Sequence, residues 1–273
     1  MKEVVVFNDI AGIAACTLGV SLPLLSVCDC KVYPVPTAVF SSSTRVEGVQ
    51  FTSLSAFLPK VAAHWSGLPF APDAILLGCF ADAVGAEAVK PIVERFKKAG
   101  AFVMIDPVMG DEGSVFASPE HREVMRRMVR FADLTCPNFT EFCVLIGADF
   151  EQLEALPYTE KIDFIKGHVA SLGVSKVIVT GVRDGAKVAN FVYDNGKTDV
   201  FAHPFHHHGV CGTGDMFSNI VLAHVLWGKP LSEAVQYAGQ WIAALMEEMP
   251  ERPEYGMYMG GERLMALRRQ VIG

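Results

Sequence analysis

The stretch Gly212, Thr213 and Gly214 is followed at once by the carboxylate Asp215 and then by an apolar helical run. Glycines let the backbone turn its N–H groups toward an anion, and the positive end of a helix stabilises negative charge there. Two interpretations of Asp215 remain open on this pattern. The carboxylate can cap its own helix, or it can accept a proton from a hydroxyl group that attacks a phosphate bound to the glycines.

Polar or glycine-rich residues also follow several apolar runs that are typical of buried strands. They are Asn8 with Asp9, Gly78, the segment 106–111 (DPVMGD), the segment 138–141 (NFTE) and Thr180 with Gly181. Each of them alone is most simply a turn or a helix cap. Because the carboxyl ends of parallel strands meet at one edge of a sheet, where ligands bind, their shared position predicts a single site.

Several other motifs do not carry the chemistry that they resemble. GKT at 196–198 is similar to the end of a P-loop, but Phe191 stands where its first glycine is required. A dinucleotide fingerprint that starts at Gly212 needs a glycine where Phe217 stands. The run His206–His208 has no carboxylate or cysteine partner at metal-ligand spacing, so we expect a solvated loop there.

Apolar β-rich runs alternate with helical stretches up to about residue 181, a pattern that predicts a parallel sheet with helices on both faces. Helices are expected over residues 11–27, 52–65, 84–99, 119–130 and 160–172. Asn195 and Gly196 join two β runs and predict a type I′ hairpin at an antiparallel edge. Since no linker or repeat interrupts the chain, we expect one α/β domain over residues 1–273.

The composition limits the classes of partner. Of the 273 residues, 51% are hydrophobic and 19% are charged, which allows a large core. The net charge is −7 and no basic stripe is present, so a small molecule is favoured over nucleic acid or a membrane. Seven cysteines without a CxxC pair are typical of a reducing cytoplasm. The apolar stretch 10–27 is interrupted by Thr17, Ser21 and Pro23, which favours a buried helix over an export signal.

The order of four motifs resembles that of the ribokinase-like vitamin kinases: DPVMGDEG at 106–113, CPNFTE at 136–141, VIVTG at 177–181 and GTGDMF at 212–217. The stretch VYPVPTAVFSSST at 32–44 is most similar to the pyridoxal and pyridoxamine kinase branch. The resemblance spans nearly the whole chain. It implies a ribokinase-like fold, a cytoplasmic homodimer, and transfer of phosphate from ATP, with Mg²⁺, to the hydroxymethyl group of pyridoxal, pyridoxamine or pyridoxine. It leaves a requirement for a monovalent cation open.

The same resemblance implies a role for each matching position. Asp215 would be the general base, and Gly212 to Gly214, including Thr213, would form the anion hole for the transferring phosphoryl group. Asp106 and Glu141 would arrange Mg²⁺ through its waters. The nucleotide-side positions are Asp106, Asn138, Glu141, Thr180 and Gly181.

The substrate-side positions depart from the family pattern. They are Asn8, Ser43, Thr44, Arg45, Cys79 and Asp215 itself. Ser43 stands where pyridoxal kinases usually have His, Asn8 where many have Ser, and Cys79 where Tyr is common. The resemblance therefore implies the reaction type more firmly than the substrate. Two alternatives stay open: a hydroxymethylpyrimidine kinase, and a non-catalytic relative that only holds a vitamer or a nucleotide, against which the presence of Asp215 argues.

Overall fold

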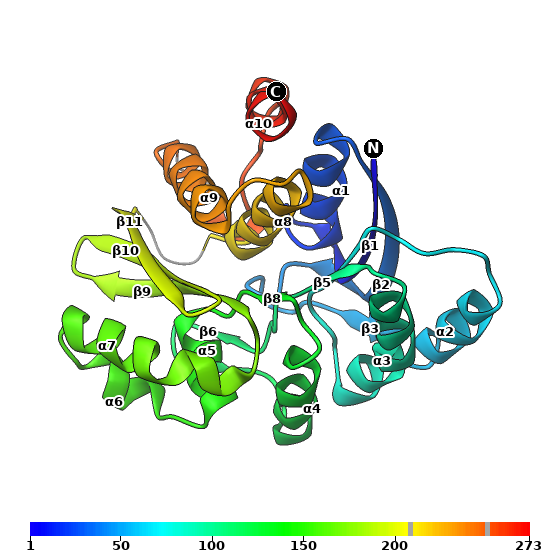
Figure 1. Ribbon diagram of the computed structural model, residues 1–273, viewed down its shortest axis with the longest axis horizontal. Coiled ribbons are helices and arrows are strands. Elements are labelled where there is room, and N and C mark those ends of the chain that lie inside the picture. Colours follow the sequence, from blue (N-terminus) through cyan, green and yellow to red (C-terminus); the bar gives the residue numbers. More distant parts are fainter. Residues whose placement is uncertain (207–209, 249–251) are drawn as a thin grey trace.

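The protein is built around a mostly parallel β-sheet (Figure 1). The computed structural model describes residues 1–206, 210–248 and 252–273. Its strands are β1 (Lys2–Ile13), β2 (Cys30–Ser42), β3 (Phe51–Ser53), β4 (Ala74–Leu77), β5 (Phe102–Ile105), β8 (Leu134–Thr135), β9 (Lys176–Asp184), β10 (Lys187–Asp194) and β11 (Lys197–Pro204). Within the described residues they form a nine-stranded sheet in the order β11-β10-β9-β8-β5-β4-β1-β2-β3. Only β3, β10 and β11 pair antiparallel, at the two edges, which confirms the predicted fold class.

Helices cover both faces of this sheet (Figure 1). One face carries α2 (Leu58–Ser66), α3 (Ala83–Lys98), α4 (Pro119–Val129), α5 (Phe139–Ile146), α6 (Phe150–Glu154) and α7 (Tyr158–His168). The other face carries α1 (Leu18–Val27), α8 (Thr213–Leu226), α9 (Leu231–Met246) and α10 (Gly261–Ile272). The 3₁₀ helices η1 (Val169–Leu172) and η2 (Pro253–Tyr255) and the small hairpin β6 (Gly110–Asp111) and β7 (Ser114–Val115) complete the described elements.

The central strands are apolar without alternation because both of their faces are buried. In β1, Val5 and Phe7 belong to the core under α3, whereas Val4 and Val6 belong to the core under α1 and α8. All four residues of β4 are buried in the same way. The sheet is therefore held from both sides, and the ends of its strands are fixed points on which a site can be built.

The first predicted helix is wrong in its first half. β1 continues to Ile13, because beyond a register shift between Asn8 and Ile10 its backbone pairs with β2 as far as Ser42. Ile10 and Ile13 are 37% and 63% exposed, so this apolar run is not part of a buried helix, and α1 begins only at Leu18. The helix expected near residue 52 likewise begins at Leu58, since residues 51–53 pair with β2 as β3.

The predicted hairpin is confirmed. Asn195 has φ 50° and Gly196 has φ 90°, and a type I′ turn requires positive φ at both of these positions. β10 and β11 pair in register on either side of this turn. In the residues that the structure describes, no helix has the length and apolar character needed to span a bilayer.

Candidate active site

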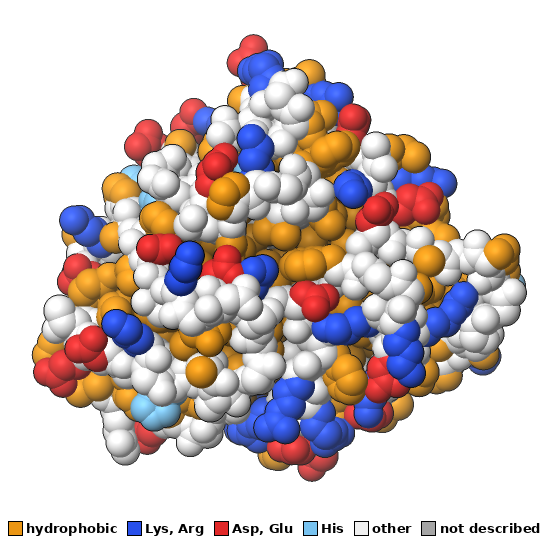
Figure 2. All heavy atoms as spheres, in the orientation of Figure 1, with side chains coloured by type: hydrophobic (Ala, Val, Ile, Leu, Met, Phe, Trp, Pro, Cys, Tyr) orange, Lys and Arg blue, Asp and Glu red, His pale blue; other side chains and the backbone are white. Residues whose placement is uncertain are grey.

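A cavity of about 1150 Å³ opens at the carboxyl ends of the parallel strands. Figure 2 shows apolar side chains gathered along a hollow in the middle of this face, with acidic and basic side chains beside it. The cavity is lined by nearly all predicted site residues, namely Ser43, Thr44, Arg45, Cys79, Asp106, Asn138, Glu141, Thr180, Gly181, Gly212, Thr213, Gly214 and Asp215. His206 also lines it, whereas His207 and His208 fall outside the described residues, so the predicted loop is not tested there.

Asp215 lies in the first turn of α8, whose N-cap is Gly212 in the left-handed conformation, with φ 85°. Its carboxylate does not cap the helix. One oxygen accepts a hydrogen bond from Asn8 Nδ2 at 3.1 Å, and the other accepts one from the backbone N–H of Thr17 at 2.8 Å. Burial raises the pKa of Asp215, and these two hydrogen bonds act in the opposite direction. The carboxylate is therefore held from outside its own helix, by β1 and the segment before α1.

Both donors to Asp215 are themselves tightly fixed. Thr17 has φ 54° and ψ −132°, a strained conformation for a β-branched residue, and this conformation aims its N–H at Asp215. Asn8 is 2% exposed, and its Oδ1 accepts hydrogen bonds from the N–H groups of Asp9 and Cys79 at 3.0 and 2.9 Å. Of the predicted site residues, Asn8 is thus placed behind the cavity wall, where it links Cys79 to Asp215.

Asp106 and Glu141 form a second acidic group in the cavity. Asp106 accepts a hydrogen bond from the Ser218 hydroxyl at 2.5 Å. Glu141 accepts backbone N–H groups on both oxygens, from Met109 at 3.0 Å and Asn138 at 2.9 Å. Burial raises the pKa of Glu141 to about 7, and burial together with the charge of Glu141 raises that of Asp106. Two close carboxylates that oppose each other's ionisation form a donor set that suits a hard cation.

The acidic groups do not form a closed metal cage. In residues 1–206, 210–248 and 252–273, no three His, Cys, Asp or Glu side chains converge on one metal position. Mg²⁺ usually keeps several waters and takes its other ligands from phosphate oxygens, so it needs few protein ligands. Asp106 and Glu141 would then hold the ion, in part through water, and the bound ion would neutralise the charge of phosphate groups in the cavity.

The loop 106–113 is fastened to the N-terminus of α5 and to both sides of the cavity. Asn138 caps α5, donates to the Gly110 carbonyl at 2.7 Å and forms a capping box with Glu141. At the cavity mouth, Arg45 Nη2 contacts the Asp111 carboxylate at 2.8 Å, and Arg183 contacts Glu112 at 3.6 Å. Arg45, which follows β2, and Arg183, which lies in β9 toward the other edge of the sheet, thus bind the consecutive acidic residues Asp111 and Glu112.

The other predicted positions complete the walls. Thr180 pairs with Asn138 in an isolated bridge, and Gly181 follows with φ 77°, so these two positions lie beside the acidic loop. Ser43 is 3% exposed, and its hydroxyl accepts the Arg45 N–H at 3.1 Å. Thr44 is exposed. Ser43 is thus part of the turn that presents Arg45.

Sequence reasoning missed the roles of three residues. Ser218 follows Asp215 by three positions, so helical spacing alone would have put it on the same side of α8. Asp9 is a strand-end residue whose position in the sequence implies no particular role, yet it lines the cavity and is 5% exposed. Nothing in the sequence signals the contact of Thr17, because it depends on a backbone angle.

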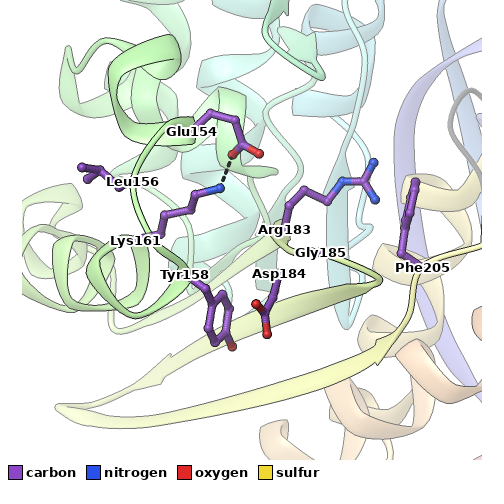
Figure 3. A pocket seen from close by; sticks show the side chains of 8 residues that line it. All are labelled: Glu154, Leu156, Tyr158, Lys161, Arg183, Asp184, Gly185 and Phe205. Atoms are coloured by element: carbon purple, nitrogen blue, oxygen red, sulfur yellow. Dashed lines mark ion pairs between the residues drawn. The ribbon is translucent and has the colours of Figure 1, made fainter.

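A smaller pocket of about 420 Å³ adjoins the cavity (Figure 3). It is lined by Glu154, Leu156, Tyr158, Lys161, Arg183, Asp184, Gly185 and Phe205. Figure 3 shows the Lys161–Glu154 ion pair, at 2.9 Å, on one side and the Arg183 guanidinium over the Phe205 ring on the other. The charges of its two acidic residues, Glu154 and Asp184, are matched by those of Lys161 and Arg183. None of the predicted site residues lines this pocket.

The chain belongs to the phosphomethylpyrimidine kinase family, whose model matches residues 24–261. Among curated proteins it is 30% identical over 189 residues to the pyridoxal kinase of Rubrobacter xylanophilus, covering 66% of this chain and 63% of that protein. The chain thus spans a little under two thirds of the length of that relative. It is 28% identical over 241 residues to the pyridoxine kinase of Bacillus subtilis, covering 80% and 84% of the two chains.

Solved structures give the same fold. A candidate phosphomethylpyrimidine kinase of Bacteroides thetaiotaomicron, crystallised with pyridoxal, superposes with a TM-score of 0.90 at 25% identity, over 97% of this chain and 95% of that one. The pyridoxal kinase of Lactobacillus plantarum superposes with a TM-score of 0.87 at 22% identity, over 99% and 98% of the two chains. The fold is therefore the ribokinase-like fold of these kinases.

Proposed function

We propose that this protein transfers the γ-phosphoryl group of MgATP to the hydroxymethyl group of a B6 vitamer: pyridoxal, pyridoxamine or pyridoxine. The observation that carries the proposal is the half-buried carboxylate of Asp215, held by two donors beside the backbone of Gly212 to Gly214. Phosphoryl transfer needs positioning and charge neutralisation more than covalent chemistry, so one base, one anion hole and a metal held by carboxylates are sufficient. The names of the pyridoxal and pyridoxine kinase relatives support the choice of acceptor.

The extent of the cavity supports a two-substrate reaction. It reaches from Phe40 and Phe51, beside the β1–β3 edge, to Asn190 and His203 in the β10–β11 edge. Asp215 lies between these ends on α8. We assign the β1–β3 side, with Ser43, Thr44, Arg45 and Cys79, to the vitamer, and the side of Asn138, Thr180 and Gly181 to the nucleotide. The acceptor hydroxyl and the γ-phosphate then meet at Asp215.

We further infer that the protein acts in the cytoplasm as a homodimer of single-domain subunits, with residues 1–273 as the kinase domain. The dimer is inferred from the resemblance of the sequence motifs to those of the B6 kinases alone, and the seven unpaired cysteines support a reducing compartment. The net charge of −7 supports small molecules over nucleic acid or membranes as partners.

A second candidate is phosphorylation of hydroxymethylpyrimidine or its phosphate. Two observations favour it: the description of the matching family, and a Staphylococcus aureus hydroxymethylpyrimidine/phosphomethylpyrimidine kinase that is 26% identical over 186 residues. The substrates of the two candidate reactions share a flat heteroaromatic ring that carries the reacting hydroxymethyl group. A non-catalytic binding role would not require the strained Thr17 to hold Asp215.

An ATP-consumption screen tests the proposal. The wild-type protein is assayed with MgATP and, in turn, pyridoxal, pyridoxamine, pyridoxine, hydroxymethylpyrimidine and a sugar. We expect turnover with at least one B6 vitamer and none with the sugar. Turnover with hydroxymethylpyrimidine alone would select the second candidate, and turnover with no ring compound would leave only a binding role.

Glu141→Gln is expected to raise the Mg²⁺ concentration needed for half-maximal activity and to lower Tm. The amide group must place an NH₂ against the N–H of Met109 or Asn138, so one buried donor loses its acceptor. That loss costs on the order of 1–3 kcal/mol, or several degrees of Tm. Glu123→Gln on the surface of α4 serves as the control. A lower Tm with unchanged Mg²⁺ dependence would limit Glu141 to holding the loop.

Asn8→Ala is expected to move the acidic limb of the kcat–pH profile to higher pH. Asn8 Nδ2 donates to Asp215 and keeps its pKa lower, so removing this donor raises that pKa, and a larger share of the base is protonated at low pH. The carboxyl and thiol groups near Asp215 are those of Asp9, Asp106, Cys16, Cys79 and Cys211. None of them is substituted, but Asn8 Oδ1 also accepts the N–H groups of Asp9 and Cys79, so Tm is measured beside the profile. An acidic limb at the wild-type pH would exclude this role of Asn8.

A further inference from the structure

Asp9 is a buried carboxylate that the proposed phosphoryl transfer does not use. It follows Asn8 at the point where β1 changes register, is 5% exposed, and lines the large cavity. No described Lys, Arg or His forms an ion pair with it. The side chains of Cys79 and Thr17 lie beside it. A thiol is a weak donor, so the carboxylate lacks the strong partner that a buried charge requires.

The surroundings of Asp9 favour a cationic or donating ligand. Burial and the neighbouring charge of Asp215 raise the pKa of Asp9 to about 7. The hydroxyl oxygen of Thr17 is buried in the same place and has no hydrogen-bond partner among the described residues. A group with two or three N–H donors would satisfy the carboxylate and this hydroxyl together. A carbonyl oxygen at the same place cannot donate to the carboxylate; it can only accept a hydrogen bond, from the Thr17 hydroxyl or from Asp9 in its protonated form.

The position of Asp9 indicates which part of a substrate it meets. If Asp215 accepts the proton of the hydroxymethyl group, a carboxylate close to Asp215 faces the substituent on the neighbouring ring atom. In pyridoxamine this substituent is an aminomethyl group, and in hydroxymethylpyrimidine it is an amino group. In pyridoxal it is an aldehyde, and in pyridoxine a second hydroxymethyl group. Amino groups are therefore the substituents that complement Asp9 best.

We propose that Asp9, with the Thr17 hydroxyl, is a binding site for an amino group next to the reacting hydroxymethyl group, and that this site selects amino-substituted rings as substrates. This inference rests on the proposed kinase function and names its substrate class. Pyridoxamine, whose ammonium group is charged at neutral pH, is the preferred B6 vitamer. Pyridoxal and pyridoxine fit the ring position but leave Asp9 without a cation.

The test compares kcat/KM for pyridoxamine and pyridoxine in the wild-type protein and in Asp9→Asn. Asn has nearly the shape of Asp and no charge, so it removes the charge-assisted hydrogen bond and little else. We expect the wild type to prefer pyridoxamine by at least about tenfold, and the variant to lose about 10- to 100-fold on pyridoxamine, as for loss of a hydrogen bond to a charged group. The pyridoxine value should change by less than about threefold. Asp163→Asn on the exposed surface of α7 is the matched control.

The outcomes separate this inference from the function on which it rests. A wild-type protein that phosphorylates no ring compound overturns the kinase proposal. A wild-type kinase that treats pyridoxamine and pyridoxine alike overturns the role of Asp9, even if Asp9→Asn does not fold. An equal loss on both vitamers in a folded variant, shown by an unchanged Tm, also overturns it. A loss confined to pyridoxamine supports it.

Discussion

Asp215→Asn is expected to lower kcat by about 10²- to 10⁴-fold, because the amide cannot accept the proton of the acceptor hydroxyl. The affinity for MgATP should change little, since the backbone N–H groups of Gly212 to Gly214 remain in place. The helix should be unaffected as well, because the Asp215 side chain does not cap α8. The measurements are kcat and KM for MgATP with the best ring substrate.

The stability of this variant reflects two opposing effects. The amide removes a half-buried charge whose pKa is raised by desolvation, which stabilises the fold. It also presents its NH₂ to one of the two donors, Asn8 Nδ2 or the Thr17 N–H, which costs on the order of 1–3 kcal/mol. We therefore expect Tm to shift by only a few degrees. A variant that keeps more than about a tenth of the wild-type kcat would show that Asp215 is not the general base.

The parts of the fold that the sequence predicts are those whose causes are local. Asp82 and Ser118 cap α3 and α4 with their side chains, and both helices lie close to their predicted bounds. The turn at Asn195 and Gly196 is also a local property. The second half of β1 was missed because its pairing with β2 brings together residues about 29 positions apart, as in Ile13 with Ser42, and an apolar run does not reveal such a partner.

The sequence predicts which residues line the candidate site better than it predicts the hydrogen bonds between them. The rule that strand ends share one edge predicts that Asp106 and Glu141 lie in a single site, and in the structure both line one cavity together with Asp215. The spacing of Asn138 and Glu141 also predicts their capping box, which the structure contains. The two hydrogen bonds that Asp215 accepts could not be predicted from the sequence, because they depend on the positive φ of Thr17 and on the burial of Asn8.

The second large loss of activity is expected on substitution of Gly212, the N-cap of α8. Gly212 has φ 85°, and a Cβ at this position would lie 2.1 Å from the Ala15 carbonyl oxygen and 3.0 Å from Cys16 Cα. Both neighbours are backbone atoms, so an added methyl group must push the segment 15–17 or the start of α8 aside. That segment carries the Thr17 N–H that holds Asp215. One methyl group therefore disturbs the anion hole and the base together.

Gly212→Ala is accordingly expected to lower kcat by about 10²- to 10³-fold, the range for loss of an anion-hole donor. Gly228→Ala is the matched control, because Gly228 has φ 80° at the other end of α8 and nothing within 4 Å of an added Cβ. Both variants carry the strain of a left-handed alanine, about 1–2 kcal/mol, and lose Tm accordingly. Only Gly212→Ala adds the clash, so it should lose more Tm and nearly all activity. Equal kcat in the two variants would mean that the backbone of Gly212 takes no part in binding the transferring phosphoryl group.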